Sequence, residues 1–98
     1  MPRYVVLERW TDQGVRAFSE SHVRADASGD LMSRFGVRIE PYWTMGEYDL
    51  VSLVEAPDDE TVSAVLLADA MKGNVRTTTL RAFDRSEMER LVARLDSV

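Results

Sequence analysis

The order of strand-like and helix-like segments restricts the fold of this chain more than any single residue does. Segments rich in β-branched and aromatic residues, such as Arg3–Trp10, are typical of strands, whereas apolar residues spaced three or four apart indicate helices. The predicted strands cover residues 3–10, 37–45, 48–55 and 74–83. The predicted helices lie at residues 19–35, 62–70 and 84–95. The order is therefore strand, helix, strand, strand, helix, strand, followed by a third helix.

This order matches the split βαβ arrangement of ferredoxin-like domains. We expect an α+β fold in which residues 1–98 form one domain, because the length suits a single compact unit. Right-handed connections would place the first two helices on one face of a four-stranded antiparallel sheet. The third helix is an addition at the C-terminal end, and Asp84 with Glu87 resembles a capping box at its start.

The turn between the second and third strands contains Gly46 and Glu47, and this spacing predicts a tight hairpin. Glycine is suited to the positive φ that such a turn requires. Asp49 follows the turn, and we expect its carboxylate to accept hydrogen bonds from loop amides. Pro41 lies within the second strand. Because proline cannot donate to a strand ladder, that strand is expected at a sheet edge or with a bulge.

Strand alternation divides the sheet residues between two faces. The residues expected to face the helices are Val5, Leu7, Val51, Leu53, Leu80 and Ala82. The opposite face would then carry Tyr4, Val6, Trp10, Tyr48, Leu50, Val54 and Phe83 beside Glu8, Thr77, Thr79 and Arg81. An apolar patch of this extent usually marks an interface, so we expect copies of the chain to form a homo-oligomer through this face. In the alternative, the third helix folds back over it.

The composition excludes several classes of function. The net charge of −5 argues against nucleic-acid binding, which requires a positive surface. No apolar run approaches the length of a membrane-spanning helix, so we expect a cytoplasmic protein without a membrane partner. The chain has no cysteine and one histidine, which removes disulfides, thiol chemistry and a two-histidine metal site within one chain. We predict no metal and no cofactor.

Two residues are candidate catalytic groups. Glu8 would project into an apolar, aromatic surface, where a carboxyl group either pairs with a cation such as Arg81 or acquires a raised pKa and transfers protons. His22 is the one side chain expected to titrate near neutral pH, which makes it a candidate general acid or base. The alternative for His22 is a surface residue in the first turn of a helix, and a lone haem ligand is a further possibility.

Five further residues are candidate ligand contacts. The aromatic side chains of Trp10, Trp43 and Tyr48 could wall a cavity for a planar compound, although aromatic residues on strands are more often core residues. Arg76 and Arg81 could bind a carboxylate of the ligand through paired hydrogen bonds. In the alternative, both arginines form salt bridges between subunits.

Several motifs of this chain resemble those of the GYD-domain family. The signature is present as Gly46-Glu47-Tyr48-Asp49, preceded by Trp43-Thr44-Met45. Trp10-Thr11-Asp12-Gln13-Gly14, Val54-Glu55-Ala56-Pro57-Asp58-Asp59, Gly73-Asn74-Val75-Arg76-Thr77 and Leu80-Arg81-Ala82-Phe83 also look like that family. The resemblance covers nearly the whole chain, least of all residues 84–98. It implies a bacterial domain of the dimeric α/β-barrel type, in a family without an established general activity.

These observations favour a protein that binds itself and a small organic molecule. As an enzyme, it would carry out cofactor-independent isomerisation, cyclisation or decarboxylation, with Glu8 or His22 moving protons. The alternative is a non-catalytic interaction module or regulatory subunit whose exposed sheet face contacts a partner. A haem- or metal-dependent enzyme is the third hypothesis.

Overall fold

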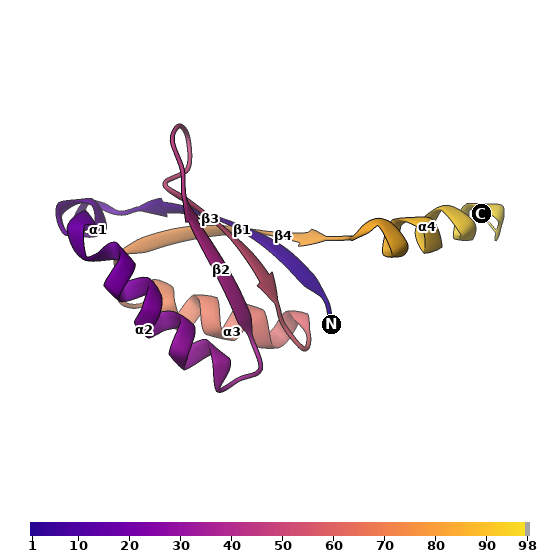
Figure 1. The fold of residues 1–98 in the computed structure, drawn as a ribbon, viewed down its shortest axis with the longest axis horizontal. Helices are drawn as coiled ribbons and strands as arrows, with labels where there is room; N and C mark the ends of the chain where they lie inside the picture. The colour runs from indigo at the N-terminus through magenta and orange to yellow at the C-terminus, as the bar shows by residue number, and fades with distance from the viewer. Residues whose placement is uncertain (98) are drawn as a thin grey trace.

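The computed structural model describes residues 1–97 as one four-stranded antiparallel sheet with helices (Figure 1). The strands are β1 (Arg3–Trp10), β2 (Arg38–Trp43), β3 (Leu50–Glu55) and β4 (Val75–Ala82). The helices are α1 (Asp12–Arg16), α2 (Ser21–Ser33), α3 (Asp59–Ala70) and α4 (Arg85–Arg94). Short 3₁₀ turns, η1 (Phe18–Glu20) and η2 (Leu95–Ser97), precede α2 and follow α4. The predicted α+β class is confirmed.

The strand order in the sheet is β2-β3-β1-β4, and every neighbouring pair is antiparallel. The strand β2 lies at an edge, as predicted from Pro41, where a residue without an N–H group costs no ladder hydrogen bond. Its pairing with β3 runs without a break from Arg38 opposite Glu55 to Trp43 opposite Leu50. The second strand therefore carries no bulge, and this continuous register assigns every residue of β2 to a face.

The core lies between the sheet and the helix pair α2 and α3, which cover one face (Figure 1). From α3, Val62, Val65 and Leu66 are buried, as the predicted helical spacing requires. From α2, however, the apolar residues that suggested the helix are mostly exposed, and Met32 fills its core position. The spacing of apolar residues thus located α2 correctly but did not identify its buried side.

The predicted assignment of the two sheet faces is wrong. Tyr4, Val6 and Glu8 of β1 are buried under the helices, while Val5 and Leu7 lie on the open face. The same exchange holds in β3, where Leu50, Ser52 and Val54 are buried and Leu53 is 48% exposed. Both faces are apolar, so hydrophobicity alone could not decide between them. The hydroxyl of Tyr4, which donates a hydrogen bond to Asp59 at the start of α3, fixes this orientation.

The connection between β2 and β3 is a six-residue loop, residues 44–49, and not the tight hairpin that we predicted. Gly46 has a φ of 102°, so glycine does serve a left-handed position in it. The Asp49 carboxylate accepts a hydrogen bond from the amide of Trp10 at 2.9 Å, and the Asp49 amide donates to the carbonyl of Glu8 at 2.9 Å. The Asp49 carbonyl also accepts a hydrogen bond from the Thr44 amide at 2.9 Å, so Asp49 both closes the loop and joins it to β1.

The C-terminal helix α4 extends away from the body beyond the end of β4 (Figure 1). The molecule is consequently elongated, with principal extents of 52 × 31 × 17 Å. No residue of α4 is buried, although the predicted capping box is present at Asp84 and Glu87. The alternative in which this helix folds back over the open sheet face is therefore not what the structure shows.

Candidate functional site

A cavity of about 150 Å³ lies between the sheet and the helices α2 and α3. Its polar lining includes Glu8 of β1, Ser52 of β3 and Asp69 of α3, together with the cationic Arg24 and Lys72. Its apolar wall includes Trp10, Met32, Ile39, Leu50 and Val75. The cavity therefore brings a buried carboxyl group from the sheet close to a second carboxyl group from a helix.

Glu8 is the most strongly perturbed group of this cavity. The residue is only 7% exposed, and burial raises the pKa of its carboxyl group to about 7, with a further increase from the negative charge of Asp69. Asp69 itself accepts a hydrogen bond from Ser28 Oγ at 2.8 Å and lies 3.7 Å from Lys72 Nζ. A carboxyl group with this pKa exists in both protonation states near neutral pH and can donate or accept a proton.

The Ser52 hydroxyl adds an unsatisfied polar group to the same wall. Within residues 1–97, Ser52 Oγ is buried and has no hydrogen-bond partner. Ser52 alternates with Leu50 and Val54 on the buried face, and Asp69 continues the buried helical series of Val62, Val65 and Leu66. The prediction missed both residues, yet their spacing was the signal that could have placed them beside the core.

Only two of the seven predicted site residues, Glu8 and Trp10, line this cavity. Trp10 also packs against Phe18, with ring centroids 6.4 Å apart. Trp43 lies outside the cavity lining, and its indole N–H donates a hydrogen bond to Ser21 Oγ at 2.8 Å. His22 is exposed at the start of α2. The structure therefore does not bring the two candidate proton-transfer groups, Glu8 and His22, into one cavity.

The remaining predicted ligand contacts have other neighbours. The ring of Tyr48 lies 4.8 Å from the guanidinium group of Arg9, and Arg76 is exposed on β4. Arg81 stacks over Phe83 at 4.6 Å and forms an ion pair with Glu87 at 3.3 Å. Arg81 therefore does not pair with Glu8, and of the two alternatives given for Glu8 the structure favours the raised pKa. The catalytic role of Glu8 stays a prediction.

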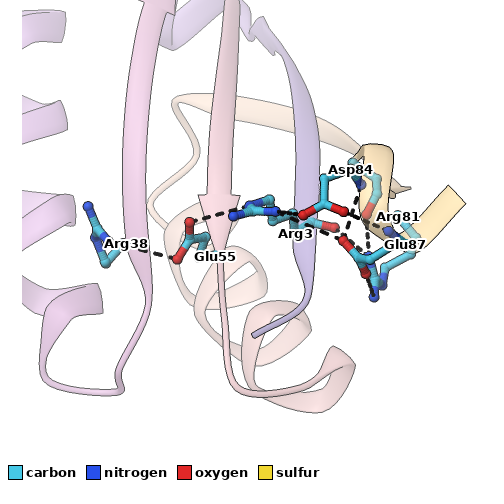
Figure 2. Close-up of polar contacts among 7 residues, drawn as sticks. Arg3, Arg38, Glu55, Arg81, Asp84 and Glu87 are labelled. Atoms are coloured by element: carbon cyan, nitrogen blue, oxygen red, sulfur yellow. Dashed lines mark hydrogen bonds and ion pairs between the residues drawn. The ribbon is translucent and has the colours of Figure 1, made fainter. Parts of the chain in front are cut away.

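A network of charged residues connects the sheet to the start of α4 (Figure 2). Arg3 lies at its centre, 3.4 Å from Glu55 and 2.5 Å from Asp84. The capping hydrogen bond from the Glu87 amide is the main cause that holds the pKa of the Asp84 carboxyl group below its usual range, and the hydrogen bond from Arg3 adds to it. The base of α4 is thus fixed to the sheet by ionic contacts instead of apolar packing.

The open face of the sheet carries a group of apolar side chains outside the core. We call its residues Val5, Leu7, Val51, Leu53, Leu80 and Ala82 the open-face patch; they are neighbours in the strand register. Leu53 and Leu80 are each 48% exposed, and the others are partly exposed. The sequence therefore predicted an apolar open face correctly but assigned the wrong set of residues to it.

Two kinds of site are not found among residues 1–97. No three histidine, cysteine, aspartate or glutamate residues come together in a group that could hold a metal ion. Within the same part of the chain, no helix has the length and apolar character needed to cross a bilayer.

The fold and its surfaces define a small α+β protein with one sheet, a covered face and an exposed apolar face. The chain belongs to the GYD-domain family, because the family model described as "GYD domain" matches residues 4–92. The predicted resemblance is thereby confirmed.

Two proteins of the bacterium Thermus thermophilus are similar to this chain. One is 37% identical over 97 residues, which cover 97% of this chain and 99% of that protein, and is named "Glutamine synthetase and cystathionine beta-lyase binding protein". The other is TTHA0845, whose crystal structure has a TM-score of 0.55 and 30% sequence identity, and the match covers 86% of this chain and 95% of that chain.

The name of the first relative corrects the predicted partners. We predicted that the chain binds itself and a small organic molecule, whereas this relative is named for binding two other proteins. The prediction placed too much weight on a partly aromatic pocket and on self-association, since an exposed apolar surface does not by itself indicate which molecule covers it. This prediction of partners is therefore wrong.

Proposed function

We propose that this chain is an interaction or regulatory subunit that binds a metabolic enzyme, either glutamine synthetase or cystathionine β-lyase. The observation that carries this proposal is the relative that is 37% identical over nearly the full length of both chains and is named for binding those enzymes. The alternative function derived from the sequence, a module whose exposed sheet face contacts a partner, agrees with it.

The open-face patch is the surface that we propose for this contact. It forms a continuous apolar layer across β3, β1 and β4, because Val5 lies between Leu53 and Leu80 in the register. Charged side chains surround it, including Arg3, Arg9 and Arg76. An apolar centre with a polar rim is the usual composition of a protein–protein interface.

The topology supports this arrangement. The strand order β2-β3-β1-β4, with α2 and α3 as the two long connections, is the one expected for a ferredoxin-like fold. We propose that the chain has this fold and that it leaves the second sheet face free for a partner. In such an arrangement the helices complete the core of the domain, and the second sheet face supplies the interface.

The test uses the purified full-length chain with glutamine synthetase and cystathionine β-lyase from the same organism. Isothermal titration calorimetry should detect saturable binding to at least one of the enzymes. Leu53→Arg should weaken that binding by at least about tenfold, because it places a charge within the open-face patch beside Val5.

Leu67→Arg is the matched control. Leu67 is 67% exposed on α3, on the helix side of the molecule, so the same substitution there should leave the affinity unchanged. Absence of binding to both enzymes would exclude the proposed function. If the two substitutions weaken binding equally, the open-face patch is not the surface that binds the enzyme. Light scattering of both variants would reveal whether a second copy of the chain covers the patch instead.

A further inference from the structure

The helix α4 carries an apolar stripe without a partner in the described part of the chain. We define the α4 stripe as Met88, Leu91, Val92 and Leu95, which lie at i, i+3, i+4 and i+7. Their exposed fractions range from 37% for Leu91 to 65% for Leu95. This spacing places all four side chains along one side of the helix, the pattern by which a helix binds in a groove of another protein.

Polar contacts at the start of α4 hold the helix in a direction in which the rest of the domain does not cover the α4 stripe. The capping box is formed by Glu87 N donating to Asp84 Oδ1 at 2.8 Å and Asp84 N donating to Glu87 Oε1 at 3.1 Å. Arg3 and Arg81 bind the same two carboxylates from β1 and β4 (Figure 2). These contacts fix the direction in which α4 leaves the sheet, and that direction is away from the body (Figure 1).

A short projecting helix is a marginal structure in water without such a partner. Isolated helices shorter than roughly 12 to 15 residues are only weakly stable, and α4 has ten residues. Its stability therefore depends on the capping box and on whatever covers the stripe. Three exposed apolar side chains on one side of α4, continued by Leu95 at the start of η2, are better explained by a bound groove than by solvent.

The charges beside the stripe indicate the chemistry of that groove. Arg90 and Arg94 lie along one edge, where they line an open hollow with Phe83, Leu91 and Glu87. The Glu87 carboxylate is already paired with Arg3 and Arg81. Among residues 1–97 neither of these two arginines is in a salt bridge. On the other edge, Arg85 pairs with Glu89 at 3.2 Å. One edge is therefore cationic and available, and the other is internally neutralised.

We infer that α4 is a docking helix whose stripe inserts into an apolar groove of the partner enzyme, with carboxylates of that groove facing Arg90 and Arg94. This inference rests on the proposed function and adds a second contact beside the open-face patch. The chain as a whole has a net charge of −5, so its body repels an acidic surface. Arg90 and Arg94 make the charge along one edge of α4 locally positive. This makes α4 the element suited to a groove with carboxylates along its edge.

The experiment measures binding of full-length variants to the enzyme that the wild-type chain binds. Met88→Gln with Leu91→Gln removes half of the stripe but keeps residues that favour a helix, and it should weaken binding by at least about tenfold. Arg90→Glu with Arg94→Glu should slow association by about tenfold or more and make it less sensitive to salt. Arg16→Glu, an exposed position on α1, is the control for an added negative charge and should change neither quantity.

The outcomes separate the inference from the proposed function. If the α4 variants bind with wild-type affinity while Leu53→Arg does not, α4 is not a docking helix and the proposed function stands. If the wild-type chain binds neither enzyme, both are wrong. Circular dichroism of each variant verifies folding, and light scattering gives its oligomeric state. A change of oligomeric state caused by the α4 variants alone would overturn the inference, because the stripe would then be covered by a second copy.

Discussion

At the scale of single residues, Glu8 is expected to make the stability of the protein depend on pH. Its folded-state pKa of about 7 exceeds the ordinary value of 4.5, so between these values the folded state binds more protons than the unfolded state. The free energy of unfolding therefore loses a contribution as pH rises from 4.5 to 7. Glu8→Gln removes this loss. The free energy of unfolding of Glu8→Gln minus that of the wild type should therefore be higher at pH 8 than at pH 4.5, by up to about 3 kcal/mol.

Urea denaturation of the wild-type chain and Glu8→Gln at several pH values between 4.5 and 8 measures this difference. Carboxyl groups distant from Glu8 contribute equally in both proteins and cancel. The control is Glu20→Gln, the same substitution at an exposed position in η1. A difference for Glu8→Gln that is constant across the range would contradict the raised pKa.

At the scale of elements, two glycines in helices predict opposite effects of the same substitution. In α2, a Cβ at Gly29 would lie 3.7 Å from Ile39 Cγ2, an ordinary contact, so Gly29→Ala should stabilise the protein by up to about 1 kcal/mol. In α1, a Cβ at Gly14 would lie 2.0 Å from the carbonyl oxygen of Asn74, so Gly14→Ala should destabilise it by about 2 kcal/mol. Thermal and urea denaturation measure both; a loss of stability in Gly29→Ala would show that α2 packs differently.

The sequence was sufficient to place the elements but not to orient them. The strand β1 and the capping box of α4 were predicted at their observed positions, because β-branched runs and the Asp84–Glu87 spacing are local signals. The buried side of β1 was not, because Val5 and Tyr4 both suit a core and only the contact of Tyr4 with Asp59, 55 residues away, separates them. Local patterns carry no information on such distant contacts.

The same distinction applies to the candidate site. Glu8 was singled out because a carboxylate among apolar residues is locally unusual, but it was assigned to the open sheet face. Its pKa is raised by burial on the opposite face, beneath the helices. The role of Asp69 beside it depends on the packing of α3 against the sheet, and the long loop at residues 44–49 depends on the hydrogen bond from Trp10 to Asp49. Neither contact can be read from spacing in the sequence.

At the scale of the whole molecule, the elongated shape predicts that α4 contributes little to the stability of the domain. None of its residues is buried, and its contacts with the sheet are solvent-exposed ion pairs such as Arg3 with Asp84, a kind of contact that contributes little to stability. A chain that ends at Phe83 should therefore unfold cooperatively, with a free energy within about 1 kcal/mol of the full-length value. Urea denaturation at two protein concentrations tests this. A loss of several kcal/mol that depends on concentration would show that α4 packs against another copy in solution, because only association makes stability concentration-dependent.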